Sequence, residues 1–311
     1  MLKTAGIHHI TAYVNDVQAG VDFYAGLLGL RLIKQTIHFD AHDVYHLYFG
    51  NESGHPGTIV SFLLKEDFPS GRIGSGQVGV TVYAVPSGSL LFWRQRLKRY
   101  GVDYMEIHRF GEDYLRFTDN AGLLIDLVER GKIPDSARTF GGVPGQYAIK
   151  GLDGALLFSK APWKTATVLE DIFGLTSRGQ EEGLVRYEAP GETGCRIDLN
   201  TDPIPTGIPG AGVVRHIAWR ARNESEQLMW QDMLGAKGFD PSPAVNLEYY
   251  KSVYFREPGG ILFQVATDSP GFQTDETAGQ LGSELMLPES CEAQRGTILK
   301  GLKPFRVREL G

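Results

Sequence analysis

The apolar and polar positions along the chain follow one recurring pattern: a short strand, an amphipathic helix that ends at a glycine, and two or three further strands. In the first copy, Asn15 or Asp16 is a plausible helix N-cap, and the predicted helix then runs through 21–30. Its residues Phe23, Leu27 and Leu30 share one buried face, because they fall at i, i+4 and i+7. The strands of this copy are expected at 6–14, 31–39, 45–50 and 58–64.

The same pattern returns three times, so the chain is predicted to be a fourfold repeat of a βαβββ module. The later copies span 77–129, 155–199 and 213–267. Each helix ends at a glycine, the residue that best fits a turn out of a helix with positive φ. These glycines are Gly29, Gly101, Gly174 and Gly238, which lie 72, 73 and 64 residues apart. We therefore predict an α+β fold whose four βαβββ modules form two incomplete-barrel clefts, each made from a pair of modules.

A stretch rich in proline and glycine at 131–144 is expected to link two halves of the chain. The N-terminal half, 1–135, would hold modules 1 and 2. The C-terminal half, 145–270, would hold modules 3 and 4. The remaining residues, 271–311, are expected to form a C-terminal extension of irregular structure with short helical pieces.

Composition narrows the class of protein. The chain has 311 residues, 42% hydrophobic and 22% charged, which is ordinary globular usage and excludes a disordered or fibrous protein. No apolar run reaches the ~18–20 residues needed to span a bilayer, and residues 1–6 lack the apolar stretch of a signal peptide. The net charge is −6 with no basic cluster, which argues against nucleic acid as a partner. With only two cysteines, Cys195 and Cys291, a disulfide framework is excluded, and we expect a soluble cytoplasmic protein.

Several short segments, together with the repeat, resemble a known superfamily. They are Gly-Ile-His-His-Ile-Thr at 6–11, Tyr-His-Leu-Tyr-Phe-Gly at 45–50, Gly-His-Pro-Gly-Thr at 54–58, Pro-Gly-Gly-Ile-Leu-Phe at 258–263 and Gly-Phe-Gln-Thr-Asp-Glu at 271–276. In this order and spacing they resemble the vicinal oxygen chelate superfamily, which includes glyoxalase I, bleomycin-resistance proteins and extradiol dioxygenases. More narrowly, the chain resembles its ring-cleaving hydroquinone dioxygenase branch.

The resemblance implies a metal site. Members of this branch bind Fe(II), or sometimes Mn(II), through two histidines and one glutamate on the first and last strands of a module. On this sequence the histidines correspond to His9, the second of the pair at 8–9, and to His216. The glutamate position holds Gln264 instead. Because the ligands come from modules 1 and 4, these two modules are expected to share the active cleft.

The residues themselves also favour such a site. His9 and His216 lie near the start of the first strand in two repeat units, and imidazole is the commonest protein ligand for metals. Two histidines and one oxygen donor leave three open octahedral positions, which suits Fe(II) and dioxygen. A strand histidine that only satisfies a local hydrogen bond is the competing interpretation. In the second cleft the positions equivalent to Gln264 hold Asp126 and Asp198, which we expect to be hydrogen-bonded structural groups.

Gln264 leaves three interpretations open. Its amide oxygen can bind a metal, although a neutral ligand lowers affinity and selectivity for Fe(II). The site can instead be metal-free, in a protein that binds or sequesters its ligand. A substitute carboxylate, Asp268 or Glu257, is rejected: Asp268 is four residues away, about 13 Å along a strand, and Glu257 is further still.

Other candidates surround these positions. Thr11 shares the face of His9 on a regular strand and is expected to line the pocket, whereas His8 would face the other way and support the fold or His9. Tyr254 is a candidate to hydrogen-bond a phenolic substrate or bound oxygen, or else a core tyrosine. The dioxygenases that the chain resembles usually carry a histidine where Arg215 stands, so its substrate is expected to differ.

These observations favour a metal-dependent ring-cleaving dioxygenase that acts on a hydroquinone- or catechol-type aromatic compound and dioxygen. The alternative is a relative, catalytically weak or inactive, that binds aromatic ligands and is metal-free or loosely metallated. Glyoxalase-like isomerase chemistry is disfavoured because it needs an ionisable base near the metal, which Gln264 does not supply. A homodimer is expected, because exposed edges of curved sheets often pair.

Overall fold

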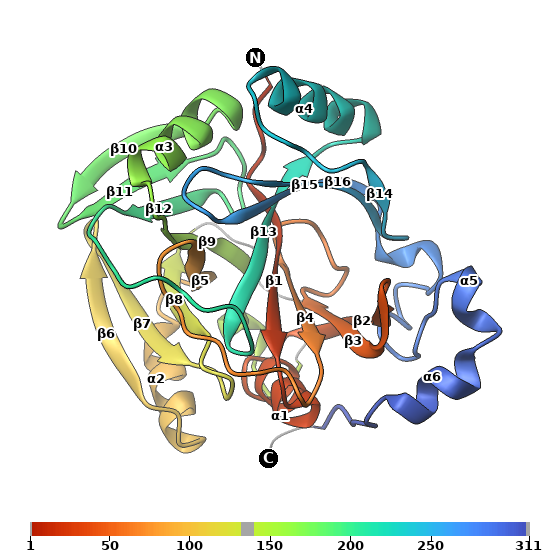
Figure 1. Ribbon diagram of the computed structural model, residues 1–311. Helices are drawn as coiled ribbons and strands as arrows, with labels where there is room; N and C mark the ends of the chain where they lie inside the picture. The colour runs from red at the N-terminus through yellow and green to blue at the C-terminus, as the bar shows by residue number, and fades with distance from the viewer. Residues whose placement is uncertain (1, 132–139, 309–311) are drawn as a thin grey trace.

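The computed structural model describes residues 2–131 and 140–308, and it contains two curled sheets of eight strands each (Figure 1). The first sheet has the strand order β14-β15-β16-β13-β1-β4-β3-β2. Its strands are β1 (Ile7–Val14), β2 (Arg31–His38), β3 (Ala41–Gly50), β4 (Ile59–Leu64), β13 (Val213–Ala221), β14 (Val245–Asn246), β15 (Tyr250–Arg256) and β16 (Leu262–Pro270). Modules 1 and 4 therefore form one sheet, as predicted.

The second sheet has the order β10-β11-β12-β9-β5-β8-β7-β6 and combines modules 2 and 3. Its strands are β5 (Gln77–Pro86), β6 (Tyr104–Arg109), β7 (Glu112–Thr118), β8 (Leu124–Arg130), β9 (Gly151–Phe158), β10 (Thr176–Glu181), β11 (Leu184–Glu188) and β12 (Arg196–Asn200). The predicted α+β class with two half-barrel clefts is thus confirmed. The boundaries 1–135, 145–270 and 271–311 stay a prediction, and most of the linker predicted at 131–144 lies outside the described residues.

One helical segment follows the first strand of each module. These segments are α1 (Val17–Val21) continued by the π-helix η1 (Asp22–Leu27), α2 (Leu90–Arg99), α3 (Pro162–Thr167) continued by the π-helix η3 (Val168–Ile172), and α4 (Glu224–Ala236). The first helix begins at Val17 because the Asp16 side chain, one of the two predicted caps, accepts a hydrogen bond from Ala19 N. The four glycines expected beyond the helices all have φ between 67° and 82°. None of the helices among the described residues is long and apolar enough to cross a membrane.

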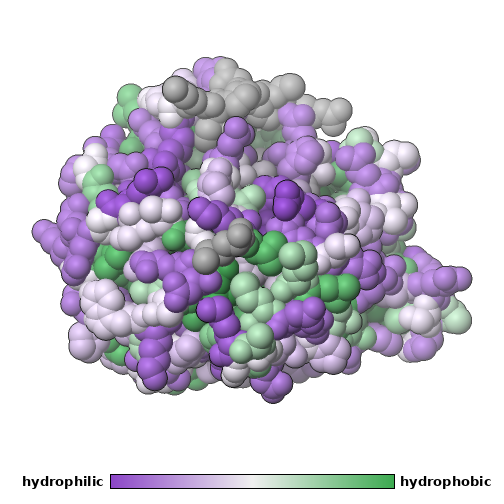
Figure 2. All heavy atoms as spheres, turned by 90° about the horizontal axis from the view of Figure 1, so that it is seen from above, coloured by the Kyte–Doolittle hydropathy of each residue, from purple (hydrophilic) through white to green (hydrophobic). Residues whose placement is uncertain are grey.

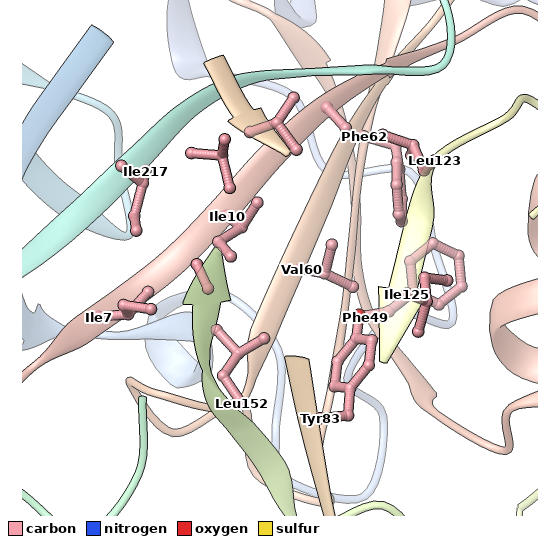
Figure 3. Packing of buried hydrophobic residues seen from close by; sticks show 14 of the residues in the cluster. Ile7, Ile10, Phe49, Val60, Phe62, Tyr83, Leu123, Ile125, Leu152 and Ile217 are labelled. Carbon is pink, nitrogen blue, oxygen red and sulfur yellow. The ribbon is translucent and has the colours of Figure 1, made fainter. Parts of the chain in front are cut away.

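The main cluster of buried apolar side chains draws on strands of both sheets and on the helical segments. Figure 3 shows Ile10 and Ile217 of the first sheet beside Leu152 of the second, all fully buried. The outer face in Figure 2 is mainly hydrophilic, with smaller apolar areas between polar ones. Burial of the apolar side chains thus holds the two sheets together and fixes the central strands β1 and β13.

Two bulges interrupt the central pair of antiparallel strands, β1 and β13. Between the pairs Ile7↔Trp219 and His9↔Ala218, β1 has one extra residue, His8. Between Thr11↔His216 and Ala12↔Val214, β13 has one extra residue, Arg215. A bulge breaks the alternation of side chains and redirects the extra residue. Both bulges lie beside the predicted ligands.

The C-terminal segment lies along the β2 side of the first sheet, where Figure 1 shows α5 (Glu289–Glu292) and α6 (Arg295–Gly301) beside β2 and β3. It is anchored by Lys34 of β2, whose side chain is fully buried and forms ion pairs with Asp275 and Glu276. Arg31 adds hydrogen bonds to backbone carbonyls of this segment. The segment is therefore fixed against the strands that face the candidate site.

Candidate metal and substrate site

The strands β1 and β13 bring His9 and His216 together, although they are 207 residues apart. Their Nε2 atoms are 3.2 Å apart and both side chains are buried. Two nitrogen ligands at about 2.1 Å from one ion and at right angles would be about 3.0 Å apart. The observed separation therefore suits two ligands of a single cation.

Gln264 lies on β16, beside β13, and is fully buried. Its Nε2 donates to Tyr254 OH at 3.0 Å and to Ser252 Oγ. Its Oε1 is buried and makes no hydrogen bond of normal geometry, although a contact between Gln264 and His216 partly offsets the lowering of that imidazole's pKa by burial. Leaving a buried carbonyl oxygen without a partner costs roughly 1–3 kcal/mol. A bound cation would supply a partner for this atom.

The donor set fits a divalent cation. Among residues 2–131 and 140–308, no three His, Cys, Asp or Glu side chains could hold a metal together, so a third donor must be of another type. Gln264 supplies such a donor. The carboxylates of Asp268 and Glu257 are engaged elsewhere, with Arg220 and with Thr165 respectively. The ligand set His9, His216 and Gln264 stays a prediction.

Burial keeps both histidines uncharged. Burial lowers the pKa of His9 well below its usual value, and the neighbouring His8 lowers it further. Burial, and to a smaller extent the charge of Arg215, lowers the pKa of His216 well below its usual value. Both imidazoles are therefore neutral near pH 7, as a metal ligand must be.

His8 does not face away from His9, so this expectation from regular alternation was wrong. The bulge at His8 turns its ring toward its neighbour, and the two Nδ1 atoms are 2.9 Å apart. Burial lowers the pKa of His8 to about 4, so it is neutral as well. One of the two rings donates to the other, and His8 therefore helps to orient His9.

Thr11 starts a chain of hydrogen bonds that leads away from the histidines. Its Oγ1 is 3.0 Å from His216 Nε2 and 2.8 Å from Ser61 Oγ. The chain then continues through His46, Tyr48 and Tyr250, with 3.0 Å between successive partners. Sequence reasoning missed Ser61; the available signal was a single polar residue in the otherwise apolar strand β4, directly opposite Thr11.

A cavity of about 430 Å³ lies against this cluster, a usual size for a small-molecule site. Thr11, His216 and Tyr254 are among the residues that line it, so two of the predicted catalytic residues do face it. Its walls also include Phe39 and, from the C-terminal segment, Cys291. No pattern in the sequence indicated that this segment would reach the cavity.

Arg215 holds a central place in the site. Its Nη1 is 2.8 Å from His216 Nδ1, its Nε donates to Tyr13 OH at 3.1 Å, and its guanidinium is 5.6 Å from the centre of the Tyr254 ring. On a regular strand Arg215 and His216 would face opposite ways. The bulge in β13 lets both line the cavity.

The equivalent position in the second sheet is filled by the protein itself. Arg109 lies between Asp126 and Asp198, at 2.8 Å from each. Arg116 and Arg186 complete the pairing of these carboxylates. The two aspartates are therefore structural groups, as expected.

Comparisons with known proteins agree with this fold. Residues 6–127 match the Glyoxalase/Bleomycin resistance protein/Dioxygenase superfamily, and the chain belongs to this superfamily. Its relatives point to a narrower branch. It is 51% identical, over 99% of both proteins, to MhqO of Bacillus subtilis (strain 168), which carries the provisional name of a ring-cleaving dioxygenase.

Two further relatives agree. The chain is 30% identical, over 96% of both proteins, to the chlorohydroquinone/hydroquinone 1,2-dioxygenase of Sphingobium indicum. A crystal structure from Bacillus subtilis, provisionally titled a dioxygenase, matches all of the chain at 50% identity with a TM-score of 0.98. The resemblance to the ring-cleaving branch is thereby confirmed.

Proposed function

We propose that this protein is a metal-dependent dioxygenase that cleaves the ring of hydroquinone- or catechol-type compounds, with Fe(II) as the expected metal and Mn(II) as the alternative. One observation carries the proposal: the Nε2 atoms of two neutral imidazoles lie 3.2 Å apart, and one of these side chains, His216, lines a cavity of substrate size. The names of the relatives supply the reaction class.

His9, His216 and Gln264 would hold the cation. When bound, a divalent cation lowers the pKa of a phenol that coordinates it and activates dioxygen. Burial raises the pKa of Tyr254, so its phenol stays protonated and is able to donate a hydrogen bond to a substrate oxygen. The hydrogen-bond chain that begins at Thr11 offers a path for the proton that the substrate hydroxyl loses.

The second candidate function is a protein that binds an aromatic ligand with little or no metal. Two observations favour it. All three donors are neutral, so a bound ion would keep its full +2 charge. In addition, Arg215 donates to His216 Nδ1, whereas a histidine that binds metal through Nε2 usually donates from Nδ1 to an acceptor.

Metal analysis and oxygen uptake decide between the two. The protein is purified without added ions, its metal content is measured, and oxygen uptake with methylhydroquinone is recorded before and after addition of Fe(II) or Mn(II). If the protein is a dioxygenase, we expect oxygen uptake that depends on the added ion, and we expect a ring-opened product. Less than a tenth of an equivalent of metal, with no uptake after Fe(II) or Mn(II), would reject the enzyme and leave the binding protein.

A further inference from the structure

One positively charged side chain, Arg215, lines the cavity, and no described carboxylate forms an ion pair with it. Of the residues that line it, only Arg215 and Glu248 are Arg, Lys, Asp or Glu. Glu248 is exposed to solvent, whereas Arg215 is partly buried. The histidines His38, His46 and His216 have pKa values lowered by burial, so they add no positive charge near pH 7.

The partners of Arg215 are all neutral: a tyrosine hydroxyl, an imidazole and an aromatic ring. No carboxylate of the described residues forms an ion pair with it. The arginines of the second cleft differ in this respect, since Arg109 and Arg186 both bind carboxylates. A charged group that leaves water is normally paired, because desolvation is costly. Arg215 is therefore a partly buried charge without a counter-ion among the described residues.

The guanidinium also has donors to spare. It carries five N–H groups, of which Nε and Nη1 donate to Tyr13 and His216. Burial raises the pKa of the Tyr254 phenol and a further contact with the guanidinium opposes that rise, so at least two N–H groups are left for a ligand. Arg215 also lines a second cavity of about 270 Å³, which leaves room beside it for a ring substituent.

We propose that Arg215 is a specificity residue that binds an acidic substituent, and that the preferred ligands of this site are aromatic diphenols carrying a carboxylate or a similar anionic group. A carboxylate would supply the missing counter-ion and accept from the remaining N–H groups of the guanidinium. The bulge in β13, which places Arg215 and His216 on the same cavity, would set this group beside the metal position. The choice of substrate rests on the proposed function, but the binding preference does not.

A matched pair of ligands tests the charge alone. The probes are 2,5-dihydroxybenzoate and 2,5-dihydroxybenzamide, which have nearly the same shape and differ in charge. Their dissociation constants are measured by calorimetry without oxygen, on metal-free and on Fe(II)-treated protein. A charge-assisted hydrogen bond in a partly buried site predicts that the acid binds at least about 10-fold more tightly than the amide.

Variants locate the effect. Arg215→Gln is expected to reduce the acid-to-amide ratio to about 1, and Arg215→Lys, which keeps the charge, to retain most of it. Glu248→Gln removes the other charged group and is expected to keep or raise the ratio. The proposal is overturned by a ratio near 1 in the unchanged protein, by an unchanged ratio in Arg215→Gln, or by a loss of preference in Glu248→Gln.

This test separates the two proposals. A preference for the acid that depends on Arg215, without oxygen uptake on any diphenol, would reject the dioxygenase and retain the anion site. Metal-dependent oxygen uptake on methylhydroquinone, without preference for the acid, would retain the dioxygenase and reject the anion site.

Discussion

The change Gln264→Glu gives the most direct test of the metal site. Gln264 donates from Nε2 to the hydroxyls of Ser252 and Tyr254, and its Oε1 has no partner. Both hydroxyls can rotate to donate to a carboxylate, so the substitution keeps these contacts and adds one negative charge. The new charge is fully buried and can be compensated only by a cation.

Two opposite effects follow. Without metal, the variant should lose about 3 kcal/mol of unfolding free energy, because an uncompensated charge is buried. With metal, its affinity for Fe(II) should rise at least 10- to 100-fold, about 1.4–2.8 kcal/mol, because a carboxylate replaces a neutral donor. Thermal unfolding with and without Fe(II), together with metal analysis after dialysis against a chelator, measures both effects.

Gln77→Glu is the matched control. Gln77 is also buried, but its Oε1 already accepts a hydrogen bond from Gly74 N at 3.0 Å, so a carboxylate there needs no cation. Its metal content should equal that of the unchanged protein. If Gln264→Glu likewise changes neither the iron content nor the effect of Fe(II) on unfolding, Gln264 is not the third ligand.

Three further predictions concern stability. The pKa of His8 is lowered to about 4, below the ~6.5 of the unfolded chain. The unfolded state therefore binds more protons at His8 between these values, and His8 should account for about 3 kcal/mol of the stability that the metal-free protein loses as pH falls from 6.5 to 4, in addition to the losses from His9, His46 and His216; denaturant titrations of the protein and of His8→Gln across this range check this, and a variant with the same loss as the unchanged protein would contradict it. Lys34→Met should lower the unfolding free energy by about 3 kcal/mol and expose residues 271–308 to protease, since it leaves the buried Glu276 unpaired; unchanged protection would show that the ion pairs do not anchor the segment. Asp198→Asn should destabilise the protein by a similar amount, because Arg109 and Arg186 lose a partner, while iron content stays the same; a fall in iron content would place a metal in the second cleft.

Much of the fold was predictable because it follows from local patterns. The helical periodicity and the helix-ending glycines such as Gly29 and Gly174 recur in each module, and module equivalence then places His9 and His216 on neighbouring strands. The pairing of modules 1 and 4 followed from the assumption that both histidines share one cation.

The rest depends on departures from regularity. Alternation along a strand places His8 and His9 on opposite faces, and only the bulge brings their rings together. The contact between Arg215 and His216 likewise depends on a bulge, and no periodic pattern in the sequence predicts it. The part of the cavity wall around Cys291 arises from packing between residues about 250 positions apart, which a single sequence does not reveal.

Because Arg109 lies between Asp126 and Asp198, the second sheet needs no metal ion to balance its buried carboxylates. There the chain carries its own permanent positive charge, so the acidic centre of that sheet is compensated from the moment of folding. In the first sheet, none of the three predicted ligands, His9, His216 and Gln264, is acidic, so no negative charge among them needs a cation. The protein should therefore reach its native structure even in an iron-starved cell.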